Sequence, residues 1–151
     1  MRRPGLLVAA LMSLALFSCS RNGDHLLVAN NLSLEGNWRM VTVRDNSSGF
    51  MHTKPGAITG DVDITFVPVA PGKGFINGKT PTNELFKDCN QYTLGEGDKI
   101  AIPCISVTKV AETSWGLDFL QNITKSDSYS IEPDGKLRIH AEKKTLYFER
   151  N

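Results

Sequence analysis

The chain has 151 residues, the size of one domain, and carries 17 Lys and Arg residues against 16 Asp and Glu residues, for a net charge of +1. This balance argues against a nucleic-acid-binding protein, which needs a clustered basic surface. Apolar residues make up 40% of the chain and charged residues 22%, a composition typical of globular proteins rather than disordered ones.

An apolar segment lies near the N-terminus, at residues 6–17, where Ser13 is the one polar position. As a helix this segment would be about 18 Å long, whereas a bilayer core is about 30 Å thick. It is therefore too short to span a membrane. With Arg2 and Arg3 in front of it, the segment predicts a secretory signal peptide over residues 1–18.

The end of this segment, Leu16-Phe17-Ser18-Cys19, resembles the lipobox of bacterial lipoproteins. The resemblance implies that the Cys19 thiol receives a diacylglyceryl group and becomes the mature N-terminus, held in a membrane. Ser20 follows, and by resemblance to enterobacterial sorting rules the location is the outer membrane of the cell envelope. The alternative is an ordinary signal peptide cut near Ser18, with Cys19 a free thiol.

Residues 19–33 are mainly polar and irregular and predict a tether, followed by one β domain over residues 34–151. Alternation is clearest at Val62, Ile64 and Phe66, which share one strand face. Strands are expected at residues 36–44, 61–66, 75–76, 92–94, 99–102, 128–131, 137–139 and 145–148, with a polar loop at 45–60.

Cys89 and Cys104 flank a predicted hairpin whose turn is Gly95-Glu96-Gly97-Asp98. Pairing that is symmetric about the middle of this turn places Leu94 opposite Lys99. Five residues further along each strand it places Cys89 opposite Cys104. Opposite residues have Cβ atoms about 4.5–5.5 Å apart, close to the about 3.5–4.5 Å of a disulfide. In an exported chain these cysteines therefore predict a disulfide, and the alternative is two free buried thiols.

One helix is predicted between Thr113 and Thr124, with Thr113 or Ser114 as its cap. Its apolar positions recur at helical spacing on one face and are Trp115, Phe119, Leu120 and Ile123. At least seven short strands with one short α-helix predict a mainly β fold, either a small antiparallel barrel or a strongly rolled sheet. Closure into a barrel would also remove exposed strand edges.

Several short motifs follow one another along the chain: Leu34-Glu35-Gly36-Asn37-Trp38, Cys89-Asn90-Gln91-Tyr92, Thr108-Lys109-Val110-Ala111, Phe119-Leu120, Tyr129-Ser130-Ile131 and Leu146-Tyr147-Phe148. In this order they resemble the META domain of HslJ-like heat-shock lipoproteins. Asn83 with Phe86 is an alternative counterpart to Asn90 with Tyr92. The family's second Cys would follow Ala111, where this chain has Glu112.

The resemblance implies a mainly β, barrel-like domain of the cell envelope that is linked to stress tolerance and has no established catalytic residues. A Leu-x-Gly-x-Trp opening such as residues 34–38 also occurs in lipocalin-like proteins, which form a similar barrel. A lipocalin-like barrel is therefore the alternative fold.

Residues with catalytic or metal-binding potential are few. The three histidines, His25, His52 and His140, are far apart and lack a metal-ligand spacing. Asp61 and Asp63 share one strand face and could hold a cation or form an acid/base pair, but a solvated strand face is the simpler interpretation. We therefore predict a protein that is not an enzyme, with no catalytic residues, cofactor or metal.

Two functions remain for such a chain. The first is a lipid-anchored, non-catalytic envelope protein that contacts the membrane through its N-terminal lipid and binds another envelope protein. The alternative is a lipocalin-like carrier whose aromatic residues line a cavity for a small apolar ligand. An interior filled by side chains would argue against the carrier, whereas an internal cavity of about 300 Å³ or more would favour it.

Overall fold

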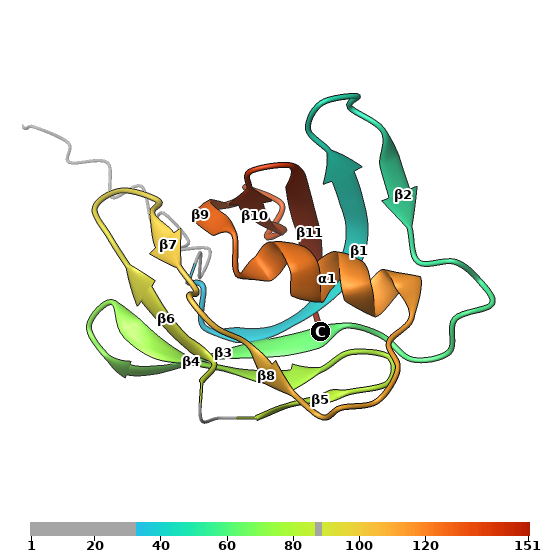
Figure 1. The fold of residues 1–151 in the computed structure, drawn as a ribbon. Helices are drawn as coiled ribbons and strands as arrows, with labels where there is room; N and C mark the ends of the chain where they lie inside the picture. Colours follow the sequence, from blue (N-terminus) through green and yellow to red (C-terminus); the bar gives the residue numbers. More distant parts are fainter. Residues whose placement is uncertain (1–32, 87–88) are drawn as a thin grey trace, which may run out of the picture.

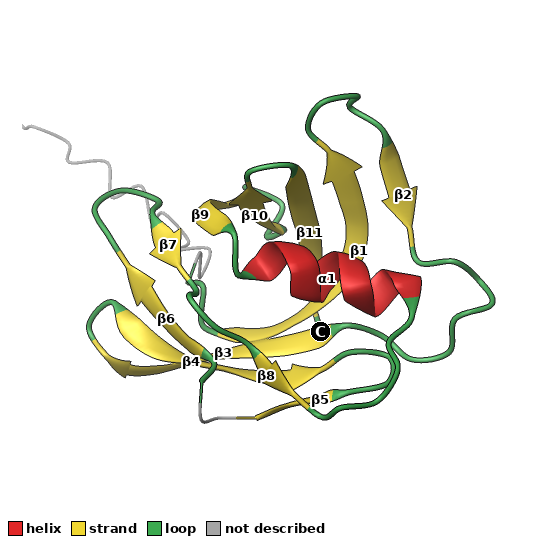
Figure 2. Ribbon diagram, in the orientation of Figure 1, coloured by secondary structure: helices red, strands yellow, loops and turns green. Residues whose placement is uncertain are grey.

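The computed structural model describes residues 33–86 and 89–151, so the predicted signal peptide, Cys19 and almost all of the tether lie outside the described residues. Figure 1 shows strands rolled around one helix, and Figure 2 shows that helix crossing the concave side of the sheet. The elements are β1 (Gly36–Asp45), β2 (Met51–Thr53), β3 (Asp63–Ala70), β4 (Lys73–Lys79), β5 (Glu84–Phe86), β6 (Gln91–Leu94), β7 (Ile100–Ala101), β8 (Ser106–Val107), α1 (Ser114–Ile123), β9 (Ser126–Ile131), β10 (Leu137–Ala141) and β11 (Lys144–Arg150).

The strands form one antiparallel sheet in the order β7-β6-β4-β3-β1-β11-β10-β9. Its two ends nearly meet. Lys99 forms a single bridge with Ser128, and the Tyr129 amide donates to the Asp98 carbonyl over 2.8 Å. The prediction of a mainly β, antiparallel and barrel-like fold with one short helix is therefore confirmed.

β1 lies in the middle of this sheet and explains an uneven spacing in the sequence. Trp38, Met40 and Val43 are all at most 2% exposed, although intervals of two and then three residues separate them. The pairing of β1 with β11 is irregular between Met40 and Thr42, where Val41 is one extra residue in β1. The extra residue shifts the alternation, so that Val43 again points into the core. The first part of β1 pairs with β3 on its other edge, and the later part pairs with β2.

Large apolar side chains fill the space that the sheet and helix enclose. Those with less than 2% exposure are Trp38, Trp115, Phe66, Phe119, Phe148, Ile64, Ile76, Ile102, Ile123, Leu137, Ile139 and Leu146. The carrier hypothesis concerns five aromatic residues of the sequence as cavity linings. Four of them are packed core, namely Trp38, Trp115, Phe66 and Phe119, whereas Tyr129 is half-buried. Within the described residues, no helix is long and apolar enough to cross a membrane.

Helix α1 follows the prediction closely. The Thr113 side chain caps it by accepting a hydrogen bond of 3.1 Å from the Gly116 amide. Gly116 is buried, and a Cβ atom there would overlap the Glu112 side chain. The glycine therefore allows a close approach that compensates for its low helix propensity.

The β6–β7 hairpin forms, but its predicted register is wrong by one residue. Leu94 pairs with Ile100 instead of Lys99. The loop contains five residues rather than four, because Gly97 adopts a left-handed conformation with φ of 66° and the Gly95 amide bonds to the Lys99 carbonyl.

Three strands were not predicted. β2 lies inside the expected polar loop at 45–60, and β5 and β8 have three and two residues. Segments this short contain too few positions for an alternating pattern to emerge. They form because neighbouring strands supply partners.

Candidate functional site

The residues singled out as possible metal or acid/base groups do not form a metal centre. Among residues 33–86 and 89–151, no group of three or more His, Cys, Asp and Glu side chains is placed to hold a metal ion. His52 bonds to Asp118 through Nε2 and Oδ2, 2.9 Å apart, and its ring lies against Phe50 and Trp115. His140 is within 3.4 Å of a serine and a threonine hydroxyl. His25 lies outside the described residues.

The His52–Asp118 pair was not predicted, because 66 residues separate its members in the sequence. It connects β2 to the exposed side of α1. Both side chains are partly exposed, at 29% and 26%. With Phe50 stacked on the His52 ring and Trp115 meeting that ring edge-on, the pair holds the β1–β2 hairpin against the helix.

Asp61 and Asp63 both lie beside Arg39, but β3 begins only at Asp63, so Asp61 precedes the strand on which it was predicted. Each is paired with a cation rather than simply solvated. Lys54 Nζ lies 2.5 Å from Asp61, and Arg39 Nε lies 2.9 Å from Asp63. The hydrogen bond from Lys54 holds the pKa of Asp61 below its usual value. A carboxylate kept charged in this way, as that of Asp61 is, is a poor proton donor. The pair therefore serves to attach the β2–β3 connection to β1.

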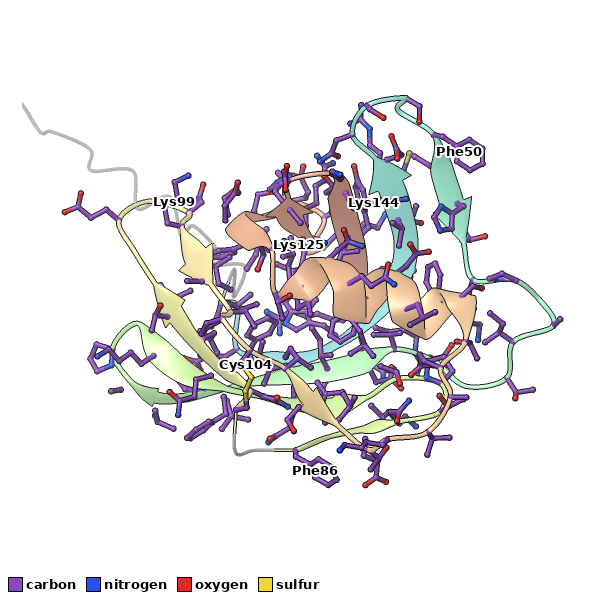
Figure 3. The ribbon with its side chains drawn as sticks, in the orientation of Figure 1. Phe50, Phe86, Lys99, Cys104, Lys125 and Lys144 are labelled. Atoms are coloured by element: carbon purple, nitrogen blue, oxygen red, sulfur yellow. A yellow bond between two sulfur atoms is a disulfide. The ribbon has the colours of Figure 1, made fainter. Side chains whose placement is uncertain are left out.

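Cys89 and Cys104 lie at disulfide distance, with Cα atoms 5.6 Å apart. Figure 3 shows the sulfur atoms at Cys104, where the chain leaves β7. The contact forms despite the shifted hairpin register, because Cys89 precedes β6 and Cys104 follows Pro103 beyond β7, so neither belongs to the strand ladder. Cys19, the predicted site of lipid attachment, lies outside the described residues.

Both asparagines considered as family counterparts are buried and hold the segment between β7 and α1. Asn90 accepts a hydrogen bond of 2.6 Å from the Ser106 amide. Asn83 accepts from the Val110 amide over 3.0 Å and donates to the Glu112 carboxylate over 2.8 Å. Both side chains are at most 3% exposed. They supply hydrogen bonds to backbone groups that the short strands nearby leave without a strand partner.

Glu112 lies where the META domain, which the chain resembles, has its second Cys. Partial burial acts to raise the pKa of Glu112, but hydrogen bonds from Thr80, Asn83 and the Thr113 amide together lower it below its usual value. The charged carboxylate therefore stabilises the fold. This contribution is complete above the unfolded-state pKa of about 4.3 and is lost as the pH falls through the lower folded-state value.

We expect Asn83→Ala to lower the free energy of unfolding by about 2 kcal/mol at pH 7, because it leaves buried partners without hydrogen bonds. The difference from the parent protein should shrink as the pH falls below the unfolded-state value of about 4.3 and through the lower folded-state pKa of Glu112, where its carboxylate becomes protonated. Urea unfolding at pH 7 and over a series of acidic pH values measures this. Gln121→Ala, at an exposed position of α1, is the matched control and should change stability by less than about 0.5 kcal/mol. Equal stability of the two variants would contradict the assigned role.

The outside of the barrel carries an open groove of about 460 Å³, which we call the outer groove. Tyr147 faces it, since its neighbours Leu146 and Phe148 both point into the core with 0% exposure. Arg138 lies over the Tyr147 ring, 5.3 Å from its centroid. The lining residues are Val41, Thr42, Met51, Glu132, Pro133, Asp134, Lys136, Arg138, Tyr147 and Glu149.

A second open groove of about 440 Å³ lies where the described chain begins, and we call it the entry groove. Its lining residues are Ser33, Leu34, Glu35, Pro68, Val69, Ala70, Pro71, Gly72, Lys73, Tyr92, Leu94 and Tyr129. A third, polar groove lies by Asp45 and Glu142. All three are open to solvent at the surface, unlike the filled interior.

Comparison with known proteins supports the fold. No protein-family model matches the chain, and no curated protein matches it either. A structure described as the NMR structure of the protein from Burkholderia xenovorans is similar, with a TM-score of 0.59. The match covers 82% of this chain and 87% of that one at 18% sequence identity. At this identity the similarity shows a shared fold.

Sequence reasoning missed the outer groove altogether. Its lining residues come from β1, β2, β11, β10 and the turn before β10. These residues are scattered along the sequence and form no continuous pattern. Only the order of the strands in the sheet brings them together. A signal was present in Tyr147, an aromatic residue on the outward face of an otherwise buried strand.

Proposed function

We propose that the chain is a lipid-anchored, non-catalytic protein of the bacterial cell envelope that binds another envelope protein. The lipobox-like segment at 16–19 supports the anchor, and Ser20 favours the outer membrane. The order of the short motifs supports a META-like domain with a role in stress tolerance. The barrel-like fold is compatible with both.

The outer groove is the observation that carries the binding proposal. It combines an apolar part, made by Val41, Met51 and Tyr147, with charged side chains of both signs around it. Protein interfaces have this composition, and Tyr, Met and Arg are enriched in them. Met51 is 51% exposed and Phe50 beside it is 65% exposed, although both are large apolar residues.

Strand β2 adds a second feature at the same place. It pairs with β1 along one edge, and no other described strand pairs with it. An unpaired edge offers backbone donors and acceptors to an extended segment of another protein. A partner could therefore bind along β2 while its side chains enter the outer groove.

The carrier alternative requires a cavity inside the barrel. The enclosed space is instead filled by residues such as Trp38, Phe119 and Phe148, each 0% exposed. The described grooves are open and lie at the surface. We therefore place the binding site on the outside of the barrel.

A photo-crosslinking residue at position 51, in the full lipidated chain in growing cells, tests this proposal. We expect a discrete crosslinked species, because Met51 lines the outer groove. The same residue at position 86 is the matched control, since Phe86 is also exposed, at 46%, but lies on the opposite side of the molecule (Figure 3). Arg138→Glu should abolish the species from position 51. Identical species from positions 51 and 86, or none from 51, would refute the proposal.

A further inference from the structure

The turn between β3 and β4 presents an unusual apolar surface. We give the name β3–β4 turn to the four consecutive residues Pro68, Val69, Ala70 and Pro71, of which the first three end β3 and Pro71 begins the connection to β4. All four are apolar and exposed, with Val69 60% exposed. Solvent-exposed turns are ordinarily polar, and continuous exposed apolar patches mark contact surfaces. The turn also contains two prolines, which have no backbone N–H group to leave unpaired in an apolar environment.

The position of this turn indicates what it contacts. The turn and Ser33, Leu34 and Glu35 line the same entry groove. The described chain therefore begins beside the apolar turn. Residues 19–32 separate this point from Cys19, a span of at most about 50 Å when fully extended. A lipid at Cys19 thus keeps a membrane surface within reach of the turn at all times.

We propose that the β3–β4 turn contacts the lipid surface in which the chain is anchored, so that the entry groove faces the membrane. This inference rests on the proposed lipid anchor at Cys19. Val69 enters the boundary between headgroups and acyl chains. The exposed Lys73 at the start of β4 lies at the level of the lipid phosphates. Half-buried Tyr129, which also lines the groove, has the amphipathic ring that suits this boundary.

The charges of the entry groove favour an apolar rather than an electrostatic contact. Lys73 and Glu35 are its charged lining residues and cancel one another. Contact with the membrane should therefore depend little on salt concentration. Figure 1 places the β3–β4 turn far from the β1–β2 turn, so the membrane contact leaves Phe50 and Met51 free for a protein partner.

Tryptophan quenching tests the contact directly. Val69→Trp is introduced into the full lipidated chain, which is reconstituted into phosphatidylethanolamine–phosphatidylglycerol vesicles with brominated acyl chains. Trp38 and Trp115 are 0% and 1% exposed, so added quenching reports position 69. We expect V69W emission to fall about twofold, since the ring lies at the headgroup boundary. Ala57→Trp, in the exposed β2–β3 loop, is the matched control and should show little quenching.

Three results would overturn the inference. Equal quenching of V69W and A57W in a chain that sediments with vesicles would refute the contact while leaving the anchor intact. A chain that fails to sediment with vesicles would refute both the anchor and the contact. V69W emission that is already shifted to short wavelength without vesicles would show that the tether or a second copy covers the turn.

Discussion

The Cys19→Ser variant is expected to disappear from the membrane fraction and to accumulate entirely in the soluble fraction. The lipobox resemblance implies that the Cys19 thiol accepts the lipid. A serine hydroxyl cannot replace the thiol in this reaction. The apolar segment at 6–17 is too short to hold the chain by spanning a bilayer. The four-residue β3–β4 turn is far smaller than a single acyl chain, which itself gives only marginal membrane binding.

Cell fractionation followed by mass measurement of the mature N-terminal peptide checks this result. Ser20→Ala is the control, because it alters the neighbouring residue but keeps the thiol at Cys19. It should remain in the membrane fraction with acyl chains attached. A parent protein whose N-terminal peptide lacks acyl chains would refute the lipoprotein prediction, as would a Cys19→Ser chain that stays with membranes.

Loss of the bridge between Cys89 and Cys104 should lower the free energy of unfolding by about 3 kcal/mol in the chain-entropy description of a loop of this length. The two residues are 15 apart in sequence. The bridge would restrain the unfolded chain around a five-residue hairpin loop and the two-residue strand β7. Few strand hydrogen bonds hold this part of the sheet, so the covalent link should contribute strongly.

Chemical unfolding of Cys104→Ser, in a Cys19→Ser background where Cys89 is then the one remaining thiol, measures the loss. A reducing agent provides the matched control. It should lower the stability of the background protein to about that of the variant and leave the variant unchanged. Two reactive thiols in the denatured, oxidised background protein would show that no bridge forms.

The sequence predicted those parts of the fold in which the pattern of neighbouring residues alone determines the structure. Val62, Ile64 and Phe66 alternate in the sequence and are all at most 1% exposed in the structure. Thr113 caps α1 because its hydroxyl reaches an amide three residues later, a strictly local interaction. Such features need no knowledge of distant parts of the chain.

The features that sequence missed depend on distant partners or on one backbone angle. The left-handed conformation of Gly97 lengthens a loop by one residue and so shifts the whole hairpin register. Asn83 and Glu112 meet across 29 residues of sequence, and only the assembled sheet brings them together. The Cys89–Cys104 contact was predicted through a register that is wrong, yet the contact itself survives because it lies beyond the strand ladder.

The neighbouring positions of β1 and β11 have a consequence for how the chain folds. These strands pair in the middle of the sheet, with Trp38 opposite Arg150, although more than a hundred residues separate them. A polypeptide emerging from the ribosome cannot complete its central pairing until β11 has been synthesised. Topologies with such distant pairings fold slowly, over milliseconds to seconds. A nascent chain that stays unfolded for this interval would be suited to passage through a narrow export channel before it folds on the other side.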